Sequence, residues 1–86
     1  MEKSVHTREY GVLLELLRDT RHAAGVTQVQ LAERIGETQS HLSKMERGEV
    51  RLDLIQMWTI CHALGTTLSK LVTELEKRLA AANRRK

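Results

Sequence analysis

Apolar residues recur at intervals of three and four along most of the chain, the spacing that gathers side chains on one face of an α-helix. Four of these segments are followed by a glycine, at positions 25, 36, 48 and 65, where helices commonly end in a left-handed residue. The alternation typical of a half-buried strand is missing. The pattern predicts an all-α fold of five helices, over about residues 7–24, 28–35, 39–47, 54–64 and 67–82.

Short polar residues mark where these helices begin. Thr27 and Gln30 fit a capping box, in which two side chains satisfy orphan backbone N–H groups reciprocally. The next two helices begin after Thr38 and Asp53. The inward stripes comprise Tyr10, Leu13, Leu14, Leu17, Arg21 and Ala24 on the first helix, Leu31, Ala32 and Ile35 on the second, Leu42 and Met45 on the third, and Leu54, Met57, Ile60, Cys61 and Leu64 on the fourth.

The turn between the second and third helices is very short, because only Gly36 and Glu37 precede the Thr38 cap. Two short helices joined so tightly must cross steeply, which is the geometry of a helix-turn-helix. Such a protruding helix fits the major groove of DNA, whose base edges expose a distinctive order of donors and acceptors. With its apolar residues facing inward, the third helix turns a hydrogen-bonding set outward: Gln39, Ser40, Ser43, Lys44 and Arg47.

Length and composition limit what else the chain can be. Its 86 residues predict one domain over 1–86, with a core over about 7–82 and a basic tail over 83–86. Aromatic residues make up 2%, and Pro and Phe are absent, which suits a small helical bundle. The single Cys61 cannot form an internal disulfide, and no apolar run approaches the roughly 20 residues that span a bilayer. We therefore expect a cytoplasmic protein without a membrane anchor.

The positive charge is uneven along the chain. The net charge is +3, yet residues 1–53 carry 8 basic and 9 acidic residues, whereas residues 54–86 carry 6 basic and 2 acidic residues. The basic tail either keeps the terminus solvated or binds a polyanion, and charge alone does not choose between the two.

Enzymatic chemistry has no support in the sequence. The four histidines, His6, His22, His41 and His62, are scattered without the spacing of metal ligands. No nucleophile-and-base constellation, paired carboxylates or glycine-rich phosphate loop is evident. We expect a protein that is not an enzyme and has no metal, no cofactor and no small-molecule ligand.

The stretch from Arg21 to Glu49 resembles the lambda-repressor and Cro-like helix-turn-helix family, also called the xenobiotic-response-element type. The resemblance rests on TQVQLA at Thr27 to Ala32, on Gly36, and on SKMERG at Ser43 to Gly48. The run from Arg51 to Leu68 is similar to the family's fourth helix and the start of its fifth. It covers about residues 10–72 and implies a lambda-repressor-like domain that binds double-stranded DNA.

The resemblance also implies roles for single residues. Gln28 matches a phosphate-clamping glutamine, and Arg21 and Glu46 match a structural ion pair between the first and third helices. Base reading falls to Gln39, Ser40 and Lys44, contacts to sugar-phosphate or an adjacent base to His41 and Ser43, and a phosphate contact to Arg47. The expected DNA-binding set, including the two capping threonines, is Thr27, Gln28, Thr38, Gln39, Ser40, His41, Ser43, Lys44 and Arg47.

Surplus apolar residues on the last two helices predict self-association. Ile55 and Trp58 lie beside the inward stripe of the fourth helix, and Leu75 and Leu79 extend the apolar face of a long fifth helix. A plain edge of the core is the alternative. The function expected is a transcriptional regulator, a repressor acting as a homodimer on a palindromic operator. An antitoxin, a restriction-modification controller, or an interaction module that has lost DNA binding are the other possibilities.

Overall fold

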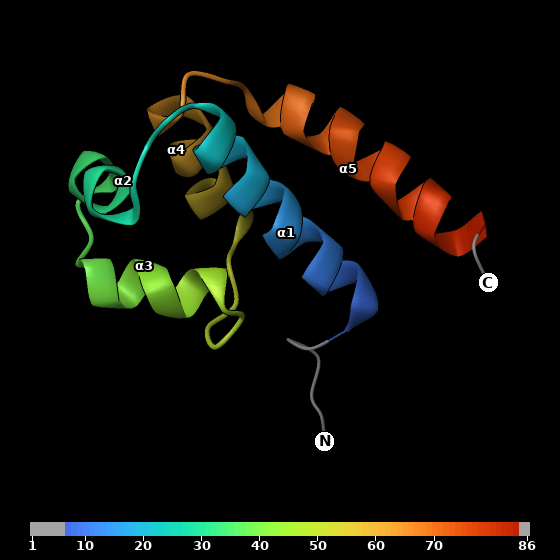
Figure 1. Cartoon of the computed structure of the whole chain (residues 1–86), viewed down its shortest axis with the longest axis horizontal. Coiled ribbons are helices and arrows are strands. Elements are labelled where there is room, and N and C mark those ends of the chain that lie inside the picture. The colour runs from blue at the N-terminus through green and yellow to red at the C-terminus, as the bar shows by residue number, and fades with distance from the viewer. Residues whose placement is uncertain (1–6, 85–86) are drawn as a thin grey trace.

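Five helices follow one another in the computed structural model, which describes residues 7–84 (Figure 1). They are α1 (Arg8–Ala23), α2 (Gln28–Ile35), α3 (Gln39–Glu46), α4 (Leu54–Ala63) and α5 (Leu68–Arg84). Every regular element within this range is a helix, so the all-α fold is confirmed and the predicted bounds are close throughout. Within residues 7–84, no helix combines the length and the apolar character needed to cross a membrane.

The helix starts follow the capping chemistry read from the sequence. The Thr27 hydroxyl accepts a hydrogen bond from the Gln30 N–H, and the Gln30 side chain accepts one from the Thr27 N–H. Asp53 and Gln56 form a second box of the same kind, which the sequence analysis did not foresee. Each box satisfies two of the donors that a helix start leaves without intrahelical partners.

The turn between α2 and α3 depends on Gly36. This residue has φ of 74°, in the left-handed region that glycine adopts at no steric cost. The next N–H, from Glu37, returns to the carbonyl of Ala32 at 2.9 Å and closes the end of α2. In Figure 1, α2 is seen nearly end-on while α3 runs across the view, so the two helices cross steeply. Ala32 is only 3% exposed, as expected for a small residue where helices approach closely.

The core lies where α1, α2, α3 and α4 meet. Its most deeply buried side chains are Leu31, Leu42, Met45 and Cys61. Two residues predicted to face inward are exposed: Ala24, which follows the last residue of α1 as its C-cap, and Leu54, which is 58% exposed. Leu54 occupies the first position of α4, and the buried Leu52 fills the end of the core instead, its N–H donating to the Tyr10 hydroxyl at 2.8 Å.

The long helix α5 packs along α1 (Figure 1). Leu71 is buried, and Leu75 is half-buried against the core. Arg78 then fastens the two helices, with Nη1 at 3.0 Å from the Asp19 carboxylate, and also contacts Glu74 on its own helix. Leu71 and Leu75 of α5 are therefore used inside the protomer, whereas Val72 is 41% exposed.

Candidate nucleic-acid interface

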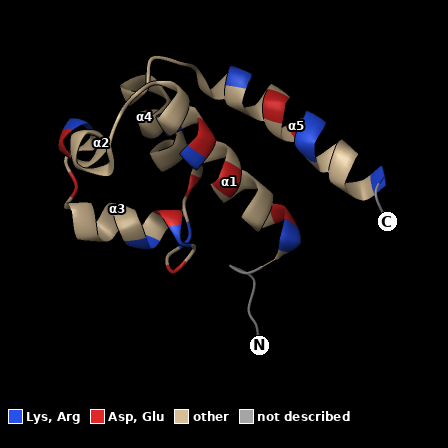
Figure 2. Cartoon of the chain, in the orientation of Figure 1, with Lys and Arg blue, Asp and Glu red and all other residues tan. Residues whose placement is uncertain are grey.

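The outer side of α3 is polar and open. Thr38, Gln39, Ser40, Lys44 and Arg47 are exposed, and His41 and Ser43 are half-buried. Leu42 and Met45, 1% and 2% exposed, hold the opposite side in the core. The structure thus brings together the residues predicted on this helix, while acidic Glu46 is buried. In Figure 2 the charged residues of α3 lie toward its C-terminal end, and the rest of the helix is uncharged.

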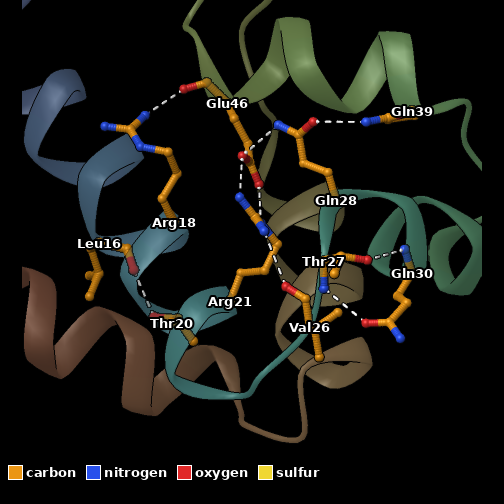
Figure 3. A network of polar contacts seen from close by, with 10 residues as sticks. All are labelled: Leu16, Arg18, Thr20, Arg21, Val26, Thr27, Gln28, Gln30, Gln39 and Glu46. Atoms are coloured by element: carbon orange, nitrogen blue, oxygen red, sulfur yellow. Dashed lines mark hydrogen bonds and ion pairs between the residues drawn. The ribbon is translucent and has the colours of Figure 1, made fainter.

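A buried ion pair holds the C-terminal end of α3 against α1 (Figure 3). Arg21 donates to the Glu46 carboxylate from Nε at 2.8 Å and from Nη2 at 3.0 Å, and each side chain is 9% exposed. Its third nitrogen, Nη1, donates to the Val26 carbonyl at 3.1 Å. Arg18 adds a bond from Nη1 to the backbone carbonyl of Glu46 at 2.6 Å. The guanidinium and carboxylate expected to pair are therefore in two-point contact, the strongest geometry for such a pair.

Gln28 connects this pair to the outer face of α3 (Figure 3). Its side-chain Nε2 donates to Glu46 Oε1 at 2.9 Å, and its Oε1 accepts from Gln39 Nε2 at 3.5 Å. One N–H of the Gln28 amide remains to meet an anion. The backbone N–H groups of Gln28 and Val29 add to this, since the first residues of a helix have no intrahelical acceptor. The start of α2 therefore has the donors that a DNA phosphate needs.

Arg47, which follows α3, is occupied in this structure. Its Nε donates to Glu49 Oε2 at 2.7 Å and its Nη1 to the Ser43 hydroxyl. The bond to Glu49 raises the pKa of Arg47 and lowers the pKa of Glu49. Both groups are well exposed, so the pair is weak and a phosphate can replace the carboxylate. Glu49 was not predicted to take part, although a carboxylate two residues after an expected phosphate-binding arginine is a readable signal of such a pair.

The residues expected at a dimer interface divide into two groups. On α4, Ile55 is 70% exposed and Trp58 49% exposed, and the Trp58 ring lies against His62 with centroids 4.5 Å apart. On α5, Leu75 and Leu79 are both half-buried, and Leu75 packs against the core. Together with Leu54, these two α4 residues make up three of the five exposed large hydrophobic side chains in residues 7–84; the other two are Val29 on α2 and Val72 on α5.

The other titratable groups that the structure describes include no metal-ligating cluster. In residues 7–84, no cluster of three or more His, Cys, Asp or Glu side chains lies close enough to hold a metal ion. His6 lies outside the described residues, as do the last two residues of the basic tail. Cys61 is fully buried, and burial raises the pKa of its thiol, which makes it unreactive. The C-terminal end of α5 lies at the opposite side of the molecule from α3 (Figure 1).

Two short helices crossing steeply, with the second presenting an exposed hydrogen-bonding face, define a helix-turn-helix DNA-binding domain. The family model for the helix-turn-helix matches residues 17–71. The chain is 43% identical to the solved structure of an XRE-family-like protein from Pseudomonas syringae pv. tomato, covering 86% of this chain and 90% of that one, with a TM-score of 0.79. The protein belongs to the XRE, or lambda-repressor-like, helix-turn-helix family.

Two further relatives agree. The clp gene regulator ClgR from Corynebacterium glutamicum has a TM-score of 0.79 at 28% identity, over 92% of this chain and 84% of that one. An uncharacterised HTH-type transcriptional regulator from Methanothermobacter thermautotrophicus is 40% identical over 50 residues, which are 58% of this chain and 72% of the relative. The protein is accordingly a DNA-binding transcriptional regulator and not an enzyme.

Proposed function

We propose that the protein is a repressor that binds a palindromic operator as a homodimer, reading bases with α3. The observation that carries this proposal is the Gln28–Gln39 contact, because it places an amide from the start of α2 beside an amide at the start of α3. One amide is then available to a phosphate and the other to a base edge. A regulator acting on genomic DNA in this way works in the cytoplasm.

Base reading is assigned to three exposed side chains of α3. Gln39 can bond adenine through both ends of its amide, and Lys44 favours the acceptors of guanine. Ser40 is short enough to let the helix approach closely. Half-buried His41 and Ser43 lie at the edges of this face and suit sugar-phosphate.

Affinity is assigned to contacts with the phosphates. Gln28 and the start of α2, capped by Thr27, form one anion site, and Thr38 caps α3 in the same way. Arg47 reaches a phosphate once it leaves Glu49. These contacts position the domain on the duplex and carry no sequence information of their own.

Self-association is assigned to α4. One helix-turn-helix reads only a few base pairs, and a two-fold pair places two recognition helices about 34 Å apart in successive major grooves. Leu54, Ile55 and Trp58 offer an apolar surface outside the protomer core. Leu75 borders the interface at most, because it packs against the core of its own protomer, whereas half-buried Leu79 keeps exposed surface that can join the interface. Repression then follows from occupying a promoter.

The deciding experiment is selection of bound DNA from a random library, followed by sedimentation of the free protein. We expect an inverted repeat with half-sites one helical turn apart, and a dimer at micromolar concentration. A single unrepeated half-site bound by a monomer contradicts the homodimer, and leaves the surface of α4 to a different protein partner.

A further inference from the structure

Three side chains form a continuous chain from the interior to the outer face of α3 (Figure 3). Glu46 is 8% exposed and accepts from Gln28 at 2.9 Å. Gln28, half-buried at the start of α2, accepts in turn from exposed Gln39 at 3.5 Å. The chain thus crosses both helices of the motif and ends on the surface proposed to meet the bases.

The donors and acceptors in this series of hydrogen bonds can be arranged in only one order. A carboxylate paired with an arginine has acceptors and no donor, so Gln28 must turn its NH₂ group toward Glu46. Its oxygen then faces the other way, and Gln39 must meet that oxygen with its own NH₂ group. The free groups left on Gln39 are one N–H and the carbonyl oxygen. These are the donor and the acceptor that match N7 and N6 of adenine.

We propose that Glu46 is a positioning residue for base reading, which fixes the donor and acceptor ends of the Gln39 amide through Gln28. This inference rests on the proposed reading of a base by Gln39. Without the carboxylate, the two amides can rotate together into the reverse order, in which Gln39 shows the bases a different pattern. The buried carboxylate of Glu46 thus determines a base preference on the outer face of α3, which it does not contact.

The Arg21–Glu46 ion pair does not need the hydrogen bond from Gln28 to Glu46. Arg21 already gives the Glu46 carboxylate two hydrogen bonds, and Gln28 lies where water can satisfy its amide. If Glu46 has only a structural role, its substitution should lower the stability of the fold and should lower the affinity for all DNA sequences by the same factor. If Glu46 is a positioning residue, its substitution should change the discrimination at one base position and the NMR resonance of the remote Gln39 side-chain amide. These two measurements separate the two roles.

The first test uses the free protein and needs no DNA. Side-chain NH₂ resonances of Gln28 and Gln39 are assigned by NMR in the unmodified protein and in Glu46→Gln. We expect both amides to shift, including that of Gln39, which does not contact residue 46. An unchanged Gln39 resonance in a folded variant overturns the proposal.

The second test measures binding to a panel of single-base operator variants. In Glu46→Gln, discrimination at the position read by Gln39 should fall roughly tenfold, the scale of one bidentate base contact. Adding Gln39→Ala should cause no further loss at that position. Arg18→Met is the matched control, because it removes a contact to the Glu46 backbone carbonyl and leaves the carboxylate in place. It should leave base discrimination unchanged.

Two outcomes separate this inference from the proposed function. If Gln39→Ala alone changes no base preference, the reading role of Gln39 fails, and the NMR result still decides whether Glu46 orders the amides. If Glu46→Gln lowers binding evenly at all positions, Glu46 is structural only and the inference fails. Should Glu46→Gln not fold, Arg21→Met with Glu46→Met leaves no unpaired buried charge and should show the same loss of discrimination.

Discussion

Replacing Arg21 by methionine should lower the free energy of unfolding by more than most single substitutions do. The change removes two hydrogen bonds to Glu46 and one to the Val26 carbonyl. It leaves a carboxylate that is 9% exposed facing only the amide of Gln28. Breaking a buried pair from one side costs about 3–5 kcal/mol, because the remaining charge has lost its partner in a medium that solvates it poorly.

That cost is large for a chain of 86 residues. Domains of this size have a free energy of unfolding of about 5–15 kcal/mol, so a loss of about 3–5 kcal/mol removes roughly 30% or more of it in the lower half of the range. Each kcal/mol lowers the melting temperature of such a domain by about 4–8 °C. We expect a fall of more than about 12 °C for Arg21→Met.

The assay is urea unfolding followed by far-ultraviolet circular dichroism, with Arg21→Met, Glu46→Met and the double variant compared. The double variant should be more stable than either single one, since it buries no unpaired charge and adds apolar contacts. Losses below about 1 kcal/mol in both single variants, within the range of an exposed pair, would show that the pair is solvated and refute the reasoning.

The remaining predictions concern binding. Gln39→Ala should cost about 1–3 kcal/mol on the selected operator and relax one base position. Gln28→Ala should weaken binding to all sequences through the lost phosphate contact, and should also reduce discrimination at that same position, because it removes the link between Gln39 and Glu46; titrations over a single-base panel distinguish the two variants. Glu49→Gln should tighten binding to every sequence by a few fold at low salt, because it frees Arg47 for a phosphate; unchanged affinity would show that this arginine makes no such contact. Trp58→Ala should weaken the dimer by about 2 kcal/mol or more while the half-site preference stays, as measured by sedimentation equilibrium and DNA binding, and a monomeric parent protein would remove its basis.

The fold was predictable because its signals are local. Capping residues such as Thr27 and Thr38, and a glycine such as Gly36, set each helix end through bonds within a few residues. The apolar spacing then fixes which side is buried. Leu54 shows where this reasoning stops: its position on the stripe is compatible with burial, but it stands beyond the end of the core, and only the packing of Leu52 and Tyr10 reveals that.

The sequence predicts which residues are exposed on α3, but it does not predict the hydrogen bonds that these residues make. Outward residues of α3 follow from the inward ones, so Gln39 and Lys44 could be placed from spacing. The partners of Arg47 could not, because an exposed arginine chooses among several nearby acceptors of similar energy. Which apolar residues of α5 are buried and which are exposed depends on how α1 packs against that helix, and the periodicity of the sequence does not contain this information.

The link between Glu46 and Gln28 lay furthest from sequence reasoning, and it changes the meaning of the ion pair. A salt bridge read from the family pattern accounts for stability alone. The structure gives the same carboxylate a bond to the first residue of α2, which in turn contacts the first residue of α3. Substitutions at position 46 therefore act on folding and on the proposed reading surface together. For this reason stability and base discrimination have to be measured on the same variants, because either measurement alone would assign Glu46 only half of its role.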